Sequence, residues 1–155
     1  MAQEHTNTPS KDAGLADFMC FAVYSANLAY SRVYKPVLEE LGLTYPQYIA
    51  IVALWDEDEL TVKGLSDKLF LEPSTVTPML KRLEAMGYLT RTRGTEDERI
   101  VHIRLTEAGR RLREKARGLS PITRAAAGLN PEEFRALQRS ITTLRTNLMA
   151  AAGED

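Results

Sequence analysis

The most reactive side chain in this sequence belongs to its single cysteine, Cys20. Tyr24 follows four residues later, on the same face one turn away if the segment is helical. Four more tyrosines come next along the chain: Tyr30, Tyr34, Tyr45 and Tyr48. A phenol hydroxyl that donates a hydrogen bond to a thiolate stabilises it, and the thiolate is the nucleophilic form of cysteine. These are the residue types of an oxidation-sensitive cysteine site.

The same residues also fit an ordinary protein core. A free cysteine packs as a small hydrophobic side chain, and tyrosines at helical spacing are more often core residues than parts of a redox pocket. A lone cysteine excludes an internal disulfide. Spacing alone leaves both interpretations of Cys20 open, the inert thiol and the reactive one.

A second group of residues is suited to contact with nucleic acid. A short helix capped by Thr61 and a second helix that begins around Pro73 and ends at Gly87 are predicted, which is typical of a helix-turn-helix. The residues of the second helix predicted to face DNA are Ser74, Thr75, Thr77, Pro78, Lys81 and Arg82. Such a helix reads base edges from the major groove near its N-terminus. Pro78 either contacts a thymine methyl group or is a tolerated kink.

A β-hairpin is predicted directly after that helix, which makes the motif a winged helix. Residues 88–93 and 99–105 favour strands, and a polar tip of residues 94–98 separates them. The wing residues predicted to contact phosphates or the minor groove are Arg91, Arg93 and Arg99, with Asp97 holding the guanidinium of Arg99. An Asp97–Arg99 pair that only stabilises the hairpin is an equal alternative.

The net charge of −1, from 20 basic and 21 acidic residues, argues at first against a nucleic-acid partner. The charge is unevenly distributed, however. Residues 81–117 hold 11 basic and 6 acidic side chains, a net charge of +5, so the remainder of the chain carries −6. A basic segment that coincides with a winged helix indicates phosphate contact. A solvated charged face is the alternative interpretation.

The segments on either side of the predicted winged helix have apolar stripes that indicate a dimer interface. Apolar residues recur at helical spacing from Leu15 to Leu41 and again from Phe134 to Leu148. Because these stripes exceed what a small winged helix needs, we infer that they pack across the two-fold axis of a homodimer. Closure of a monomeric bundle is the alternative.

The predicted fold class is therefore mainly α with a small β wing. One domain is expected over residues 14–155, with a winged helix-turn-helix in residues 44–118. Dimerisation helices are expected in residues 14–43 and 119–152. Residues 1–13 are polar and lack apolar periodicity, so they are predicted to form a disordered leader.

Several classes of protein are disfavoured. The sequence has neither an apolar run long enough to span a bilayer nor the layout of a signal peptide, so we expect a cytoplasmic protein with no membrane partner. His5 and His102 are isolated, and neither paired carboxylates nor metal-ligand spacings occur. We expect no metal, no cofactor and no enzymatic activity.

Several stretches of the sequence resemble a known family. Residues 18–26, 33–38 and 41–48 resemble the organic-hydroperoxide-sensing branch of the MarR family of winged-helix repressors. Asp97-Glu98-Arg99 and the later Leu105-Thr106-Glu107-Ala108-Gly109 are similar to the general signature of that family. The resemblance extends over residues 15–150.

The resemblance implies a homodimeric repressor that binds double-stranded DNA at an inverted-repeat operator. It also implies that an organic hydroperoxide, as inducer, oxidises Cys20 to a sulfenic acid and that the operator is then released. Tyr24 and Tyr34 match tyrosines that hydrogen-bond this cysteine, and Tyr45 matches one from the partner subunit. Because this chain lacks a second, resolving cysteine, the resemblance implies a mixed disulfide with a low-molecular-weight thiol, or further oxidation.

Two other functions stay open on the sequence alone. A MarR-type repressor can be released by a small aromatic or phenolic ligand, with Cys20 incidental. A thiol peroxidase would also use Cys20, but no residue here is suited to regenerating the thiol, and the basic wing would serve no purpose.

Overall fold

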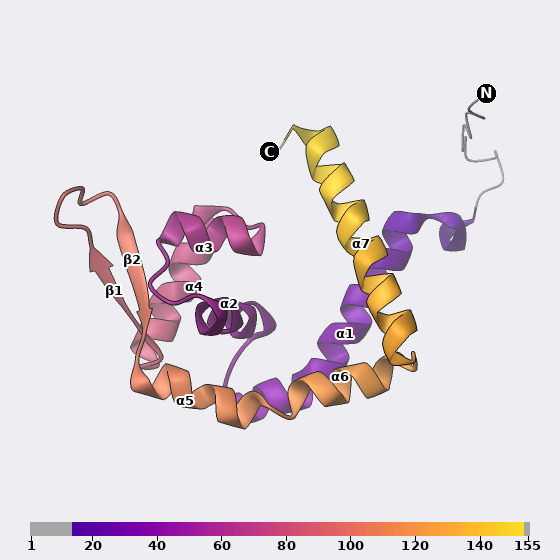
Figure 1. Cartoon of the computed structure of the whole chain (residues 1–155), viewed down its shortest axis with the longest axis horizontal. Helices are drawn as coiled ribbons and strands as arrows, with labels where there is room; N and C mark the ends of the chain where they lie inside the picture. The colour runs from indigo at the N-terminus through magenta and orange to yellow at the C-terminus, as the bar shows by residue number, and fades with distance from the viewer. Residues whose placement is uncertain (1–13, 154–155) are drawn as a thin grey trace.

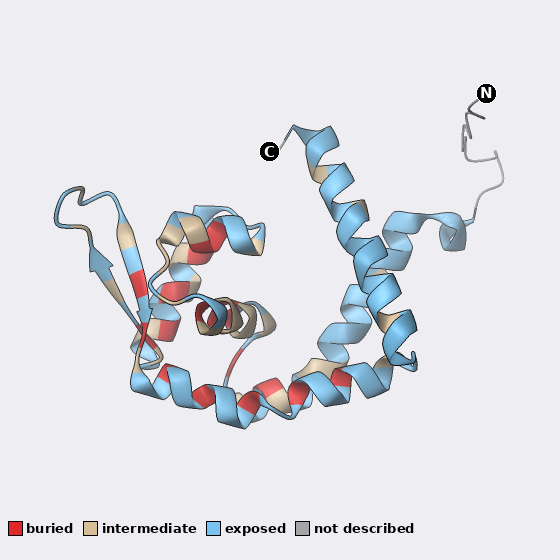
Figure 2. Ribbon diagram, viewed as in Figure 1, coloured by how far each residue is buried: buried red, intermediate tan, exposed pale blue. Residues whose placement is uncertain are grey.

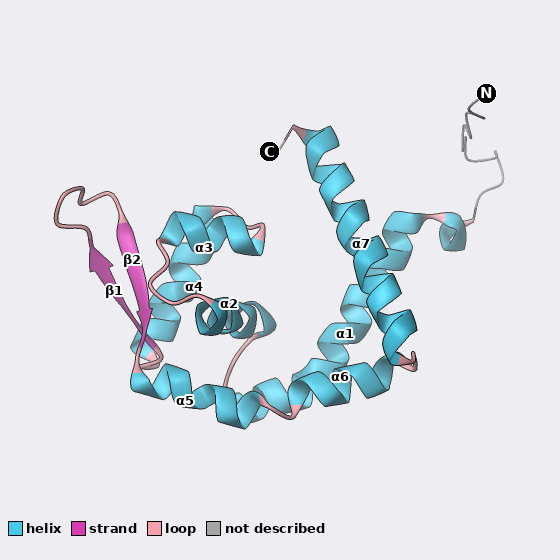
Figure 3. Ribbon diagram, in the orientation of Figure 1, coloured by secondary structure: helices cyan, strands magenta, loops and turns pink. Residues whose placement is uncertain are grey.

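The computed structural model describes residues 14–153, so the predicted leader of residues 1–13 lies outside the described part. Helices come first and last in the chain, and a two-stranded sheet lies between them (Figures 1 and 3). The elements are η1 (Leu15–Asp17), α1 (Met19–Leu41), α2 (Tyr45–Asp56), α3 (Val62–Leu69), α4 (Pro73–Ala85), β1 (Leu89–Arg93), β2 (Val101–Leu105), α5 (Glu107–Ala116), α6 (Leu119–Ala127) and α7 (Pro131–Ala152). This order has the predicted winged helix-turn-helix at its centre.

The helix boundaries follow the capping residues of the sequence. Thr44 and Gln47 form a reciprocal capping box at the start of α2. The side chains of Thr61 and Thr106 accept hydrogen bonds from backbone N–H groups at the starts of α3 and α5, and Asn130 does the same at the start of α7. These local signals confirm the predicted starts of four helices.

The first helix begins later than its apolar pattern predicts. The carboxylate of Asp17 accepts a hydrogen bond from the backbone N–H of Gly14 at 2.9 Å, and this contact closes the short 3-10 helix η1. Phe18 is then extended, with φ −88° and ψ 117°, and α1 starts at Met19. Cys20 therefore lies in the first turn of α1, where it is exposed.

The two strands are shorter than predicted. They pair antiparallel, with Leu89 opposite Leu105 and Arg93 opposite Val101. Tyr88 precedes the first strand, and Arg99 lies in the tip because its backbone N–H donates to the carboxylate of Asp97 at 3.0 Å. Arg99 was predicted to begin the second strand, and this side-chain contact places it in the turn instead.

The hydrophobic core lies mainly in the winged helix. Its nearly solvent-free side chains come from α2, α3, α4 and both strands: Ile51, Leu54, Leu65, Val76, Leu80, Leu83, Leu89 and Ile103. Leu119 extends this core along α6, which packs against α1. The winged helix thus has a continuous core, and it contacts α1 through α2 and α5 through α2 and β2.

The terminal helices are far less buried (Figure 2). No residue of α7 is buried, although apolar residues recur along it. Large apolar side chains exposed on residues 15–30 and on α7 are Leu15, Phe18, Met19, Phe21, Val23, Tyr24, Leu28, Tyr30, Leu137, Ile141 and Leu148. Within residues 14–153 no helix is both long enough and apolar enough to cross a membrane.

Candidate DNA interface and cysteine site

Helix α4 has a buried face and an exposed face. Val76, Leu80 and Leu83 are completely buried and fix the helix against the core. Outside the core lie the residues predicted to face DNA, with Thr77 half-buried and the others exposed: Ser74, Thr75, Pro78, Lys81 and Arg82. The structure therefore brings these six residues together on the accessible side of one helix, and their contact with DNA stays a prediction.

The wing is tied to the segment between α2 and α3. The backbone N–H of Ile103 donates to the carbonyl oxygen of Leu60 at 2.7 Å, and Thr61 forms a β-bridge with His102. The hairpin thus has a third backbone partner beyond its own two strands. This explains how a two-stranded hairpin, which is only marginally stable by itself, holds a fixed position next to α4.

Arg91 makes a contact that the sequence did not reveal. Glu84 of α4 accepts hydrogen bonds from the Arg91 backbone N–H at 2.9 Å and from its Nε at 3.0 Å. The backbone bond and then the side-chain bond hold the pKa of the Glu84 carboxyl below its ordinary value. Arg91 therefore braces the wing against the recognition helix, whereas Arg93 is exposed and has no ion-pair partner within residues 14–153.

At the tip of the wing, Asp97 holds Arg99 as predicted. The two carboxylate oxygens of Asp97 accept from Nε and Nη2 of Arg99, each at 3.1 Å. These side-chain bonds, followed by the bond from the Arg99 backbone, lower the pKa of Asp97. The bonds to Asp97 fix the orientation of the Arg99 guanidinium. The Arg99 side chain nevertheless stays accessible, because it is 91% exposed. DNA contact by this pair stays a prediction.

Asp58 is a structural residue that the sequence analysis missed. Its Oδ1 accepts from the backbone N–H of Leu105 at 2.9 Å, and its Oδ2 accepts from Arg110 at 3.1 Å. Partial burial acts to raise the pKa of Asp58, but bonds from the Leu105 and Glu59 backbones and from Arg110 outweigh it and lower the pKa. One carboxylate thus ties the α2–α3 loop to the end of the wing and to α5. The acidic run of residues 56–59 was the available signal.

We expect Asp58→Asn to destabilise the protein by about 1–2 kcal/mol at pH 7, because a charged acceptor is lost. The folded-state pKa lies below the unfolded-state value, so this stabilisation is present above that unfolded-state pKa. It is lost as the pH falls through the folded-state pKa. Urea unfolding at pH 7 and below pH ~4 should therefore give a difference between wild type and variant that shrinks with acidification. Glu59→Gln, which removes an exposed partner of Arg104, is the control and should change little. A pH-independent difference would contradict the role of the charge.

The positive charge of residues 81–117 is partly neutralised by residues outside that segment. Glu59 pairs with Arg104 at 2.7 Å and Asp58 pairs with Arg110. Further basic residues pair inside the segment: Arg91, Arg99, Arg111 and Arg117. Those that form no ion pair within residues 14–153 are Lys81, Arg82, Arg93, Arg113 and Lys115. Three of these five lie on α4 and the wing, the surface predicted to meet DNA.

We expect the double variant Lys81→Gln, Arg82→Gln to bind DNA more weakly and with a shallower salt dependence. Each lost phosphate contact should reduce the slope of log Kd against log salt concentration by about one. Fluorescence anisotropy at several salt concentrations measures this slope. Arg117→Gln is the control, because Arg117, directly after α5, is paired with Glu114 at 2.8 Å. An unchanged slope in the double variant would remove these two residues from the interface.

The junction between wing and α5 is held by a close backbone approach at Gly109. Trp55 of α2 donates from its indole Nε1 to the carbonyl oxygen of Gly109 at 2.9 Å. A Cβ atom at Gly109 would lie 2.1 Å from the carbonyl oxygen of Tyr88, so only glycine fits here. Thr106 caps this helix and also donates from its hydroxyl to the carbonyl oxygen of Gly87 at 2.6 Å. The Leu-Thr-Glu-Ala-Gly stretch is thus a closely packed junction between the wing and α5.

Cys20 is exposed at the beginning of α1, and Tyr24 beside it is 59% exposed. Tyr34 lies fourteen residues beyond Cys20 on the same helix, which corresponds to about 21 Å along the helix axis. Contact between Cys20 and Tyr34 within one chain is therefore impossible. The structure does not bring Cys20 together with Tyr34 and Tyr45 of its own chain.

Tyr34 and Tyr45 do lie together, at the junction of α1 and α2. Their ring centroids are 5.1 Å apart, and Tyr48 lies 6.1 Å from Tyr34. Burial, and then the neighbouring phenols, raise the pKa of Tyr45 and of Tyr48. Both effects favour the protonated phenol, which is the form that donates hydrogen bonds.

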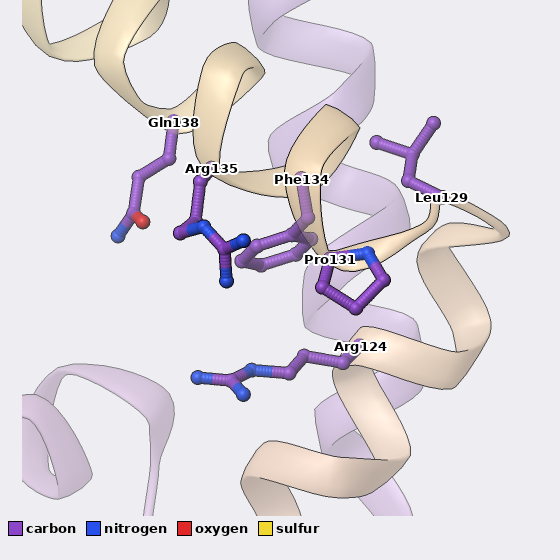
Figure 4. A pocket seen from close by; sticks show the side chains of 6 residues that line it. All are labelled: Arg124, Leu129, Pro131, Phe134, Arg135 and Gln138. Carbon is purple, nitrogen blue, oxygen red and sulfur yellow. The ribbon is translucent and has the colours of Figure 1, made fainter.

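A small pocket of about 140 Å³ lies at the corner between α6 and α7 (Figure 4). Its polar lining consists of Arg124, Arg135 and Gln138, and its apolar lining of Leu129, Pro131 and Phe134. The guanidinium of Arg124 lies 5.8 Å from the centre of the Phe134 ring. The lining thus includes neither the cysteine nor a tyrosine of the predicted site.

A winged helix with an exposed hydroxyl-rich and basic recognition helix defines a DNA-binding regulator of transcription. Residues 32–116 match the family described as transcriptional regulator SarA/Rot, and the chain belongs to this family. The match covers the end of α1, the whole winged helix and α5.

Individual relatives agree with this assignment. The HTH-type transcriptional regulator TtmR of Methylorubrum extorquens (strain PA1) is 44% identical over 87% of this chain and 69% of that protein. The organic hydroperoxide resistance transcriptional regulator of Bacillus subtilis (strain 168) is 40% identical over 86% of this chain and 91% of that protein. The structure of reduced AbfR bound to DNA is 30% identical, with a TM-score of 0.71, over 89% of this chain and 94% of that one. A structure of overoxidized AbfR bound to DNA aligns with a TM-score of 0.69. The predicted fold class and the resemblance to the hydroperoxide-sensing branch of the MarR family are confirmed.

Proposed function

We propose that this protein is a homodimeric repressor that binds an inverted-repeat operator and releases it when an organic hydroperoxide oxidises Cys20. The observation that carries the proposal is the position of Cys20, exposed in the first turn of α1 within an unpartnered apolar surface. The 40% identity to an organic hydroperoxide resistance regulator supports the same chemistry.

The homodimer is supported by the apolar side chains of the terminal helices. Phe18, Phe21 and Leu28 on the N-terminal segment and Ile141 and Leu148 on α7 are each more than one-third exposed. Monomeric proteins rarely leave so many large apolar residues together on their surface. A second copy of the chain, related by a two-fold axis, covers these helices and presents two copies of α4 to the two half-sites of the operator.

The dimer also provides the tyrosines that Cys20 lacks in its own chain. Cys20 lies in the exposed apolar segment that the second copy covers, and Tyr34 and Tyr45 lie together at the α1–α2 junction. We therefore propose that Cys20 accepts hydrogen bonds from the partner's Tyr34 and the partner's Tyr45, with Tyr24 of its own chain beside it. Phenol donors stabilise the thiolate, the form that attacks a peroxide.

The proposed reaction consumes one hydroperoxide for each cysteine. The Cys20 thiolate attacks the outer oxygen of the hydroperoxide, an S–O bond forms and the O–O bond breaks. Cys20 is oxidised to a sulfenic acid, and the alkoxide that leaves takes a proton from water to become an alcohol. A low-molecular-weight thiol then condenses with the sulfenic acid, giving a mixed disulfide and water. Because the reaction is stoichiometric, the protein acts as a sensor of peroxides and not as an enzyme. We place this sensor in the cytoplasm.

Release follows from placing an extra oxygen or a thiol adduct in a packed interface. Packed interfaces accommodate added atoms by shifting, because they have few voids. A shift of the terminal helices changes the separation of the two α4 helices, which must match about 34 Å of DNA. A differential stability of about 1.4 kcal/mol between the two states suffices for a tenfold change in affinity.

The residues of α4 and the wing that lie outside the core make the DNA contacts in this proposal. Ser74, Thr75, Thr77 and Pro78 approach base edges, and Lys81, Arg82, Arg93 and the Asp97–Arg99 pair approach phosphates or the minor groove. Arg91 contributes indirectly, because its hydrogen bonds to Glu84 hold the wing against α4.

The rival proposal, release by a small aromatic ligand, has less support. Tyr34, Tyr45 and Tyr48 pack on one another, and the pocket at the α6–α7 corner is lined by two arginines. The two proposals differ in whether the inducer must react.

The test compares cumene hydroperoxide with cumyl alcohol, which has the same shape but no O–O bond. An operator is first selected from random duplex DNA with the reduced protein, and its release is followed by fluorescence anisotropy. We expect release by an equimolar amount of the peroxide and none by the alcohol. Equal release by both compounds would establish the ligand-binding alternative and overturn oxidation sensing.

A further inference from the structure

The turn of the helix-turn-helix contains a residue in an unusual conformation. Phe70 ends α3 with φ 56° and ψ 39°, in the left-handed region that glycine and asparagine occupy far more readily than an aromatic residue. The backbone N–H of Phe70 donates to the backbone carbonyl oxygen of Asp67, and that of Leu71 donates to the backbone carbonyl oxygen of Ser66. The left-handed conformation thus closes the end of α3. A glycine would close it with less strain. The aromatic ring therefore needs an explanation outside the turn.

The ring of Phe70 meets the C-terminal helix. It is half exposed to solvent, and the guanidinium of Arg145 from α7 lies 4.1 Å from its centre. This distance and placement are those of a cation–π interaction. The contact thus connects the turn between α3 and α4 to a helix that lies far along the chain (Figure 1).

Little else joins these two parts of the molecule. A groove of about 890 Å³ separates them, with Leu71 and Thr75 on one side and Thr146 and Met149 on the other. In the described range of residues 14–153, no hydrogen bond or ion pair links α7 to α3 or α4. The Arg145–Phe70 contact is therefore well placed to restrain the angle between α7 and the recognition helix.

We propose that Arg145 is a positioning residue that fixes the helix-turn-helix relative to α7 and so determines which half-site spacing the dimer accepts. The inference rests on the proposed function in one respect, the use of α7 as a dimerisation helix. With α7 held at the two-fold axis, the Arg145–Phe70 contact on each side restricts the swing of each α4. Without the contact, each helix-turn-helix reaches a wider range of positions, so binding weakens and tolerates altered spacing.

The test uses reduced protein and a set of operators whose half-sites are moved apart by one or two base pairs. The variants are Arg145→Gln and Phe70→Asn, which keeps a residue suited to the left-handed conformation. Arg139→Gln is the matched control, because it removes the same charge from an exposed position of α7. Fluorescence anisotropy gives the ratio of Kd values between altered and original spacing, and thermal unfolding reports on the fold.

We expect wild type and Arg139→Gln to lose about tenfold or more in affinity when one base pair is inserted. Arg145→Gln and Phe70→Asn should each lose less than about threefold. The two variants should melt at or close to the wild-type temperature. Unchanged spacing discrimination in Arg145→Gln and Phe70→Asn would overturn the proposal, whether or not their stability falls.

Equal affinity of the wild type for operators of original and altered half-site spacing would overturn the proposal as well. Arg145 would then have no spacing preference to determine. No peroxide is used, so failure of oxidation sensing appears in the other assay and not in this one.

Discussion

Cys20→Ser is expected to bind the operator about as tightly as the reduced wild type and to stay bound when an organic hydroperoxide is added. Serine preserves the size and polarity of the side chain, but its hydroxyl is not oxidised by peroxides. Wild type should lose about tenfold or more in affinity after one equivalent of cumene hydroperoxide, against less than about twofold for the variant. Anisotropy titrations of labelled operator before and after peroxide measure both values. Equal release of variant and wild type would mean that the cysteine is incidental.

Mixed dimers are the control that locates the tyrosines. One subunit carries Cys20→Ser, and the other carries Tyr34→Phe and Tyr45→Phe but retains Cys20. If the tyrosines act across the interface, the remaining cysteine faces intact phenols and reacts as fast as in wild type. The homodimer of the double tyrosine variant should react more slowly. Slow oxidation in both dimers would instead place the contributing tyrosines in the same subunit as the cysteine.

Gly109→Ala is expected to destabilise the protein more than alanine at any other glycine, because its new Cβ would make the shortest contact. The new Cβ would lie 2.1 Å from the carbonyl oxygen of Tyr88, so the wing and α5 must move apart. The Trp55 hydrogen bond to Gly109 would be strained by the same movement. We expect a loss of about 3 kcal/mol, which lowers Tm by roughly 6–12 °C in a chain of this length.

The control for that variant is Gly118→Ala, where no atom lies within 4 Å of the new Cβ. Its backbone has φ −73°, so alanine fits without strain. Calorimetry of both variants under the same conditions separates a steric effect from a general effect of replacing glycine. A Tm for Gly109→Ala within a degree or two of the control would contradict the close packing at the junction of the wing and α5.

The part of this structure that the sequence predicted is the part determined by near neighbours. Thr44, Thr61, Thr106 and Asn130 cap helices through N–H groups two or three residues away, so each helix start could be read from a short stretch. The Asp97–Arg99 pair is equally local and was predicted for the same reason. Sequence patterns report such contacts because both partners lie in one short stretch.

The contacts that the sequence did not reveal join distant segments. Asp58 reaches Leu105 and Arg110, Trp55 reaches Gly109, and Arg145 reaches Phe70. Each depends on how separate elements pack, which neither charge pattern nor periodicity specifies. Glu84 and Arg91 are closer in sequence, but their pairing depends on the turn between α4 and β1.

The cysteine site lies between these two cases. The sequence singled out Cys20 and the tyrosines, and of these Tyr34 and Tyr45 pack together. The packing of Tyr34 on Tyr45 joins α1 to α2, and residue spacing could not predict it. The distance between Cys20 and Tyr34 follows from their being fourteen positions apart on one helix. That separation makes a second subunit a requirement of the proposed chemistry.

The measurement that tests the central claim most directly follows oxidation and DNA release in the same sample. Operator-bound protein is treated with increasing cumene hydroperoxide, anisotropy gives the fraction released, and intact-protein mass spectrometry gives the fraction of subunits that have gained an oxygen atom or a thiol adduct. We predict that the two fractions rise together and that peptide mapping places the added mass on Cys20. Release of unmodified protein, or complete oxidation of Cys20 with the operator still bound, would contradict the account.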